Sequence, residues 1–75
     1  MKYIICKKTY AGSDKSHFER GYFYGFEGAK IKFCTAIRQA FEFNSFKDAN
    51  GVCNLLIEGE VSNSTYIVLP SDFKA

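Results

Sequence analysis

SFKDANGVCNLLIEGE, residues 45 to 60, is the clearest helix signal in the chain and decides the fold. Ser45 and Asp48 have the spacing of an N-cap and an N3 residue, and the aspartate also complements the positive end of a helix dipole. Gly59 offers a C-terminal stop. Apolar residues recur between these ends at helical spacing: Phe46, Ala49, Cys53 and Leu56. The stretch therefore predicts a helix over about residues 46–58.

One pair of residues inside this stretch favours a different structure. Asn50-Gly51 lies between apolar residues, and an Asn-Gly pair in that setting is also a strong hairpin signal. Gly within a helix costs ~1 kcal/mol relative to Ala. Because the cap, the apolar period and the stop agree with one another, we predict one helix and keep a turn at Asn50-Gly51 as the alternative.

The flanking sequence predicts strands. Alternating apolar residues and turn signals place strands at residues 2–8, 21–27, 30–34, 41–44 and 65–69. Residues 11–20 are rich in polar residues and predict a loop, and Thr35 is expected to cap a short helical turn. We therefore predict a single small α+β domain over residues 1–75. It has a curved, mainly antiparallel sheet of four or five strands, with the one helix packed on one face.

The length and the cysteines limit how this domain is stabilised. A chain of 75 residues buries only ~60% of the surface that it exposes when unfolded, so oligomerisation is a plausible source of further stability. Cys6, Cys34 and Cys53 lack the spacing of a zinc site or a disulfide framework. We expect buried, reduced thiols, no metal and no cofactor. Without a signal peptide or an apolar run of ~18 residues, we also expect a cytoplasmic protein with no membrane contact.

ERGYFYGFEG, residues 19–28, holds more aromatic surface than one strand face needs to bury. In a regular strand Phe23 faces one side, here the helix, and the other side takes Tyr22, Tyr24 and Phe26. One helix does not cover a wide sheet, and exposed apolar area marks an interaction site. We therefore expect these three rings to form a contact surface, with Lys30 and Lys32 beside it.

Charge distribution suggests a second kind of partner. Residues 1–38 hold 8 basic and 3 acidic residues, giving 8 − 3 = +5, and residues 39–75 hold 2 and 5, giving 2 − 5 = −3. A basic half can steer an anionic partner. Residues 20–26 also resemble the aromatic octamer of the RNA recognition motif, through Arg20, Gly21, Tyr22 and Tyr24. That fold needs a helix between its first two strands, which residues 11–20 do not supply.

The alternative function is therefore single-stranded nucleic-acid binding. The bases would stack on Tyr22 and Tyr24, and the phosphates would pair with Lys30 and Lys32. No motif predicts catalysis or a small-molecule substrate. His17 is the only histidine, and the glycines lack the spacing of a dinucleotide site.

FCTAIRQAFEFNSFKDA, from Phe33 to Ala49, resembles a pattern found in small uncharacterised proteins of phages and prophages. The matching positions are Phe33, Thr35, Ile37, Ala40, Phe43, Ser45 and Ala49. The resemblance implies this fold and an origin in a mobile element, and it transfers no activity. We expect a small non-enzymatic accessory protein that acts on a host or phage assembly. It would do so through contacts with a protein partner or through homodimer formation.

Overall fold

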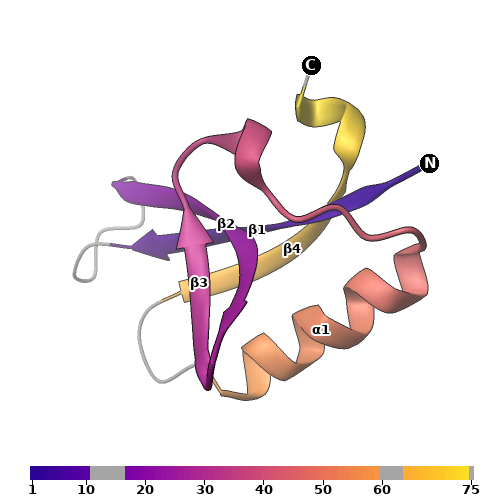
Figure 1. Ribbon diagram of the computed structural model, residues 1–75. Helices are drawn as coiled ribbons and strands as arrows, with labels where there is room; N and C mark the ends of the chain where they lie inside the picture. Colours follow the sequence, from indigo (N-terminus) through magenta and orange to yellow (C-terminus); the bar gives the residue numbers. More distant parts are fainter. Residues whose placement is uncertain (11–16, 60–63, 75) are drawn as a thin grey trace.

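The chain forms a four-stranded antiparallel sheet with one helix packed on it (Figure 1). The computed structural model describes residues 1–10, 17–59 and 64–74. Its elements are β1 (Tyr3–Tyr10), β2 (Phe18–Glu27), β3 (Lys30–Cys34), the short 3-10 helix η1 (Ile37–Gln39), α1 (Phe46–Glu58), β4 (Ser64–Pro70) and a second 3-10 helix, η2 (Ser71–Lys74). The strand order is β3-β2-β1-β4. This is the small α+β fold that the sequence predicts.

The helix has the predicted bounds. The Ser45 side-chain oxygen accepts a hydrogen bond from the Asp48 backbone N–H at 3.2 Å, so the predicted cap is confirmed. The helix ends where the Gly59 N–H donates to the Leu55 carbonyl at 3.1 Å. Gly51 lies within the helix and has no positive φ, so the alternative turn does not form. The helix buries three side chains against the sheet: Ala49, Cys53 and Leu56.

The first half of strand β1 is buried on both of its faces. Ile5 packs on the α1 side with Phe23 and Leu56, whereas Ile4 packs on the opposite side with Tyr22 and others. Both isoleucines are 0% exposed. The domain therefore has two core clusters, one on each side of the sheet.

The second core cluster is covered by residues of the chain between β3 and α1. Ala40 and Ile37 of this segment pack against Tyr22. The cap of η1 is Ala36, without a side-chain hydrogen bond, so the prediction that Thr35 caps this turn is wrong. The face that the sequence predicts to be uncovered is thus partly covered.

Residues 41–43 fill the gap where β1 and β2 separate. Pairing between these strands stops at Cys6–Tyr22. Beyond that point the Phe41 N–H donates to the Phe23 carbonyl at 2.9 Å, and Phe43 exchanges two hydrogen bonds with Tyr3. The predicted strand over residues 41–44 is therefore wrong: an isolated bridge satisfies the backbone of β1 there.

Strand β2 begins at Phe18, three residues earlier than predicted. Glu19 and Arg20 belong to the sheet because they pair with Thr9 and Lys8 of β1. Of the rest of the predicted loop, His17 is exposed and forms no regular element, and residues 11–16 lie outside the described residues. The strands predicted at 21–27 and 30–34 leave two residues for their connection, which is a tight turn containing Gly28 at φ 62°.

Alanine substitutions at Gly51 and Gly28 test the backbone conformation at these two positions. Gly51→Ala is expected to raise the free energy of unfolding by ~0.5–1 kcal/mol, because nothing lies within 4 Å of an added Cβ and Ala favours the helix. Gly28→Ala is expected to lower it, because alanine is strained at positive φ. Urea unfolding measures both. Destabilisation by Gly51→Ala would contradict an unbroken helix.

Candidate functional site

A β-bulge in β2 separates the aromatic rings that the sequence places on one face. The register with β3 shifts between Phe23 and Gly25, so Tyr24 is one residue more than β3 can match. Phe26 therefore lies on the same side as Phe23, and their ring centroids are 5.4 Å apart. The prediction that Tyr22, Tyr24 and Phe26 share one face is wrong, because their alternation assumes a regular strand.

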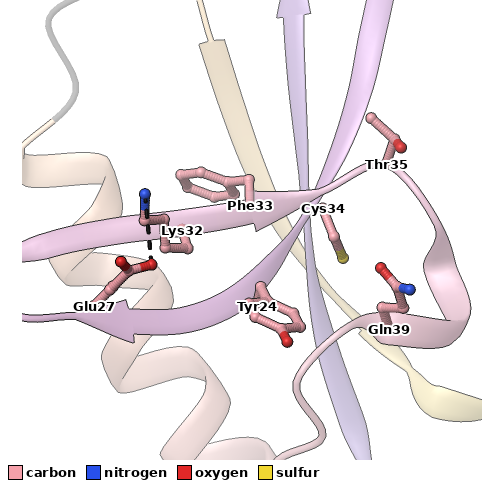
Figure 2. Close-up of a pocket in the computed structure, with 7 residues that line it drawn as sticks. All are labelled: Tyr24, Glu27, Lys32, Phe33, Cys34, Thr35 and Gln39. Carbon is pink, nitrogen blue, oxygen red and sulfur yellow. Dashed lines mark ion pairs between the residues drawn. The ribbon is translucent and has the colours of Figure 1, made fainter.

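Tyr22 is not available to a partner. It is only 8% exposed, because it packs under Ala40 and beside Ile4 and Cys6. Tyr24 and Phe26 remain 54% and 63% exposed, Phe26 on the face of Phe23 and Tyr24 on the face away from Phe33 (Figure 2). The expected contact surface is therefore divided between the two faces of the sheet.

Figure 2 shows a shallow pocket where β2 and β3 meet the segment carrying η1. Its volume is about 460 Å³, and its lining residues are Tyr24, Glu27, Lys32, Phe33, Cys34, Thr35 and Gln39. Tyr24, Cys34 and Gln39 lie to one side of β3 in this view, and Phe33 to the other. The structure thus brings Tyr24 and Lys32 together, as predicted, but without Tyr22.

The lysines of β3 share this face with a carboxylate. Lys32 Nζ lies 3.7 Å from Glu27 Oε2, and Lys30 is the cross-strand partner of Glu27. Ion pairs between exposed side chains contribute little stability. The glutamate nevertheless offsets part of the positive charge that the nucleic-acid alternative requires.

Strand β4 is an edge of the sheet and carries no charged residue: its sequence is STYIVLP. Ile67 is 52% exposed on the face away from α1. Ile57, which is 50% exposed, projects from α1 beside β4 and lines a hollow of about 300 Å³ with Ser64, Thr65 and Tyr66. Strand β3, the opposite edge, carries Lys30 and Lys32. Lysines on an edge strand hinder pairing with another chain, whereas in β4 the one residue of a type that hinders pairing is Pro70, at its last position.

A pair of cations lies on the face away from α1. Lys8 and Arg20 are cross-strand partners. Lys8 Nζ is 5.0 Å and Arg20 Cζ 5.4 Å from the centroid of the Phe18 ring. Within the described part of the chain, neither forms an ion pair with a carboxylate. The sequence did not predict this cluster, because its polar residues favour a loop over residues 11–20. Phe18, Arg20 and Tyr22 at alternate positions were the signal that could have found it.

The three thiols differ in exposure. Cys6 and Cys53 are buried, as predicted, and burial raises the pKa of both thiols. Cys34 is only half-buried, so the prediction of burial is wrong for it. Its thiol donates to the Ala36 carbonyl at 3.3 Å. Cys34 is half-exposed because it lies on the edge strand β3, which has a neighbouring strand on one side only.

In the part of the chain that the structure describes, neither a group of metal ligands nor a membrane-spanning helix is found. No three His, Cys, Asp or Glu side chains there are grouped so that they could hold a metal ion. No helix among residues 1–10, 17–59 and 64–74 is long and apolar enough to cross a membrane. Comparison with protein families, curated proteins and solved structures finds no match.

Thiol labelling tests the relative exposure of the cysteines. In the folded protein Cys34 is expected to react first with a thiol reagent, because Cys6 and Cys53 are buried and their thiols ionise less readily. Mass spectrometry of a time course would show one fast site, and Cys34→Ser would remove it. Rapid labelling of Cys6 or Cys53 before unfolding would contradict the two-sided core.

Proposed function

We propose that this protein is a small non-catalytic interaction protein that acts as a homodimer joined through β4. One observation carries the proposal: β4 is an uncharged edge strand bordered by an exposed isoleucine on each side, Ile67 and Ile57. An edge strand offers a row of backbone N–H and C=O groups to an added strand. The isoleucines supply apolar surface beside that row.

A second copy suits this edge better than it suits β3. A two-fold axis brings the same residues of both subunits together. Pairing β3 with itself would place the lysines of both subunits side by side, and like charges in that arrangement repel. Strand β4 has no charge to bring together. The difference between the two edges therefore selects β4 for self-association.

The strand length defines a specific register. Antiparallel pairing centred on Ile67, the middle residue of Ser64–Pro70, puts it next to Ile67 of the partner subunit, while Pro70, which has no backbone N–H, adds no donor at the strand end. Directly opposed Cβ atoms lie about 4.5–5.5 Å apart in such pairs, close enough for the two side chains to pack. On the α1 side Tyr66 would face Val68 of the partner subunit, with Ile57 beside it. Both faces of the β4–β4 interface would then be apolar.

Homodimer formation would also add stability to a short chain. A domain of 75 residues has a thin core, and association of apolar surfaces adds burial that the monomer lacks. Each subunit would keep its opposite edge and the exposed ring of Phe26 free for a further protein. An accessory role in a larger assembly fits such a dimer.

Substituting Ile67 tests the proposal. Ile67→Lys is expected to weaken the dimer about a hundredfold, because it buries two unpaired like charges at the axis. Sedimentation equilibrium measures this effect. Ile31→Lys is the matched control, since Ile31 is 44% exposed on the opposite edge strand and should leave the dimer intact.

Cross-linking tests the register independently. In a Cys34→Ser background, Ile67→Cys is expected to form a disulfide between subunits on mild oxidation, whereas Ile31→Cys is not. A wild-type chain that remains monomeric at every concentration at which it stays dissolved would refute the proposal. So would a dimer that Ile31→Lys dissociates and Ile67→Lys does not.

A further inference from the structure

The face away from α1 contains a cleft of about 320 Å³. Its lining residues are Cys6, Lys8, Arg20, Tyr22, Ile37, Ile67 and Leu69. They come from β1, β2, β4 and η1, so the cleft exists only in the folded chain. Its volume is at the lower end of the ~300–1,000 Å³ that is typical of small-ligand sites.

Most of the cleft is apolar. Cys6 and Tyr22 are almost fully buried where they line it. Ile37 of η1 and Leu69 of β4 are half-buried there. Ile67 is exposed beside them, as a rim residue that an apolar ligand would cover. An aliphatic chain or a ring would therefore gain burial in this cleft.

The two remaining lining residues are both cationic. Lys8 and Arg20 are cross-strand partners adjacent to the Cys6–Tyr22 pair, which places their charges together along the sheet. Neither has a carboxylate partner among the described residues. Burial raises the pKa of the Cys6 thiol, and the charges of Arg20 and Lys8 act in the opposite direction, so their field reaches Cys6. An anion bound at this end would find two charge-assisted donors.

We propose that the cleft binds a small organic anion: a carboxylate joined to an apolar chain or ring. The carboxylate pairs with Arg20 and Lys8, and the apolar part lies against Ile37, Ile67 and Leu69. This site is separate from the proposed dimerisation and does not depend on it, although Ile67 borders both.

A nucleic-acid strand fits this arrangement less well. A strand carries one charge per nucleotide and needs cations spaced along a groove with open rings for stacking. Here the two cations lie together rather than along a groove, and both are placed over the ring of Phe18. A single charge with an apolar body matches the cleft more closely.

Three probes of equal chain length test the ligand class by calorimetry on the full-length protein. Octanoate is expected to bind one per chain, about tenfold more tightly than octanol, which lacks the charge. Octyltrimethylammonium is expected not to bind. Octanoate should also shift the NMR signals of the Ile37 and Leu69 methyl groups. Equal affinity for octanoate and octanol would overturn the proposal, because the cations would then play no part.

Matched variants test the assignment of the anion site. Arg20→Gln is expected to weaken octanoate binding about tenfold and Lys8→Gln severalfold, because each removes one charged donor. Lys30→Gln is the control, since Lys30 lies on β3, outside the cleft, and should leave binding unchanged. Circular dichroism checks that each variant folds, and sedimentation of the same samples reports the oligomeric state separately.

Either of two results would overturn the proposal. An equal loss of octanoate binding in Lys30→Gln and Arg20→Gln would show a general charge effect rather than a site. Tight binding of oligothymidylate, with a steep salt dependence that Arg20→Gln flattens, would assign Lys8 and Arg20 to a nucleic-acid surface instead.

Discussion

The burial of β1 on both faces is the constraint on which the rest of the structure depends. Ile4 and Ile5 are consecutive, point to opposite sides of the sheet and are both fully buried. A single helix covers only one side. The other side must be covered by something else, and the chain uses the connection between β3 and α1, with Ala40 and Ile37 above Tyr22. Two thin cores thus replace the single core that one helix implies, and they remove Tyr22 from the surface.

The bulge at Tyr24 also changes which rings reach the surface. By moving Phe26 to the α1 side, it places that ring against Phe23, which also contacts the rings of Phe33, Phe41 and Phe43. Centroid distances of 5.4–6.5 Å are within the range of favourable aromatic pairs. The density of aromatic residues in this part of the sequence therefore serves mainly the α1-side core. The helix packs chiefly over β4 and β1, and the rings fill the space on the β2 side.

The two proposals involve neighbouring parts of one face. The free edge of β4 ends the sheet, and the cleft lies beside it, with Ile67 at the boundary. A second copy joined at this edge would lie next to the bound anion and extend the apolar wall formed by Ile67 and Leu69. Lys8 and Arg20 lie further inside the sheet, on β1 and β2, where they would remain accessible in the dimer. In the proposed arrangement a small ligand and a protein contact would share this face without competition for the same backbone groups.

The sequence by itself determined the elements whose interactions are local. The helix from Phe46 to Glu58 was predictable because its cap and its apolar period join residues only a few positions apart. The turn at Gly28 was predictable for the same reason. Only the tertiary structure decided the start of β2, the bulge, the burial of Tyr22 and the existence of the cleft. Each of these depends on residues distant in the chain, as when Arg20 pairs with Lys8 or Ala40 covers Tyr22. Alternation along one strand shows that a face is apolar, but the neighbouring elements decide whether that face is core, interface or binding site.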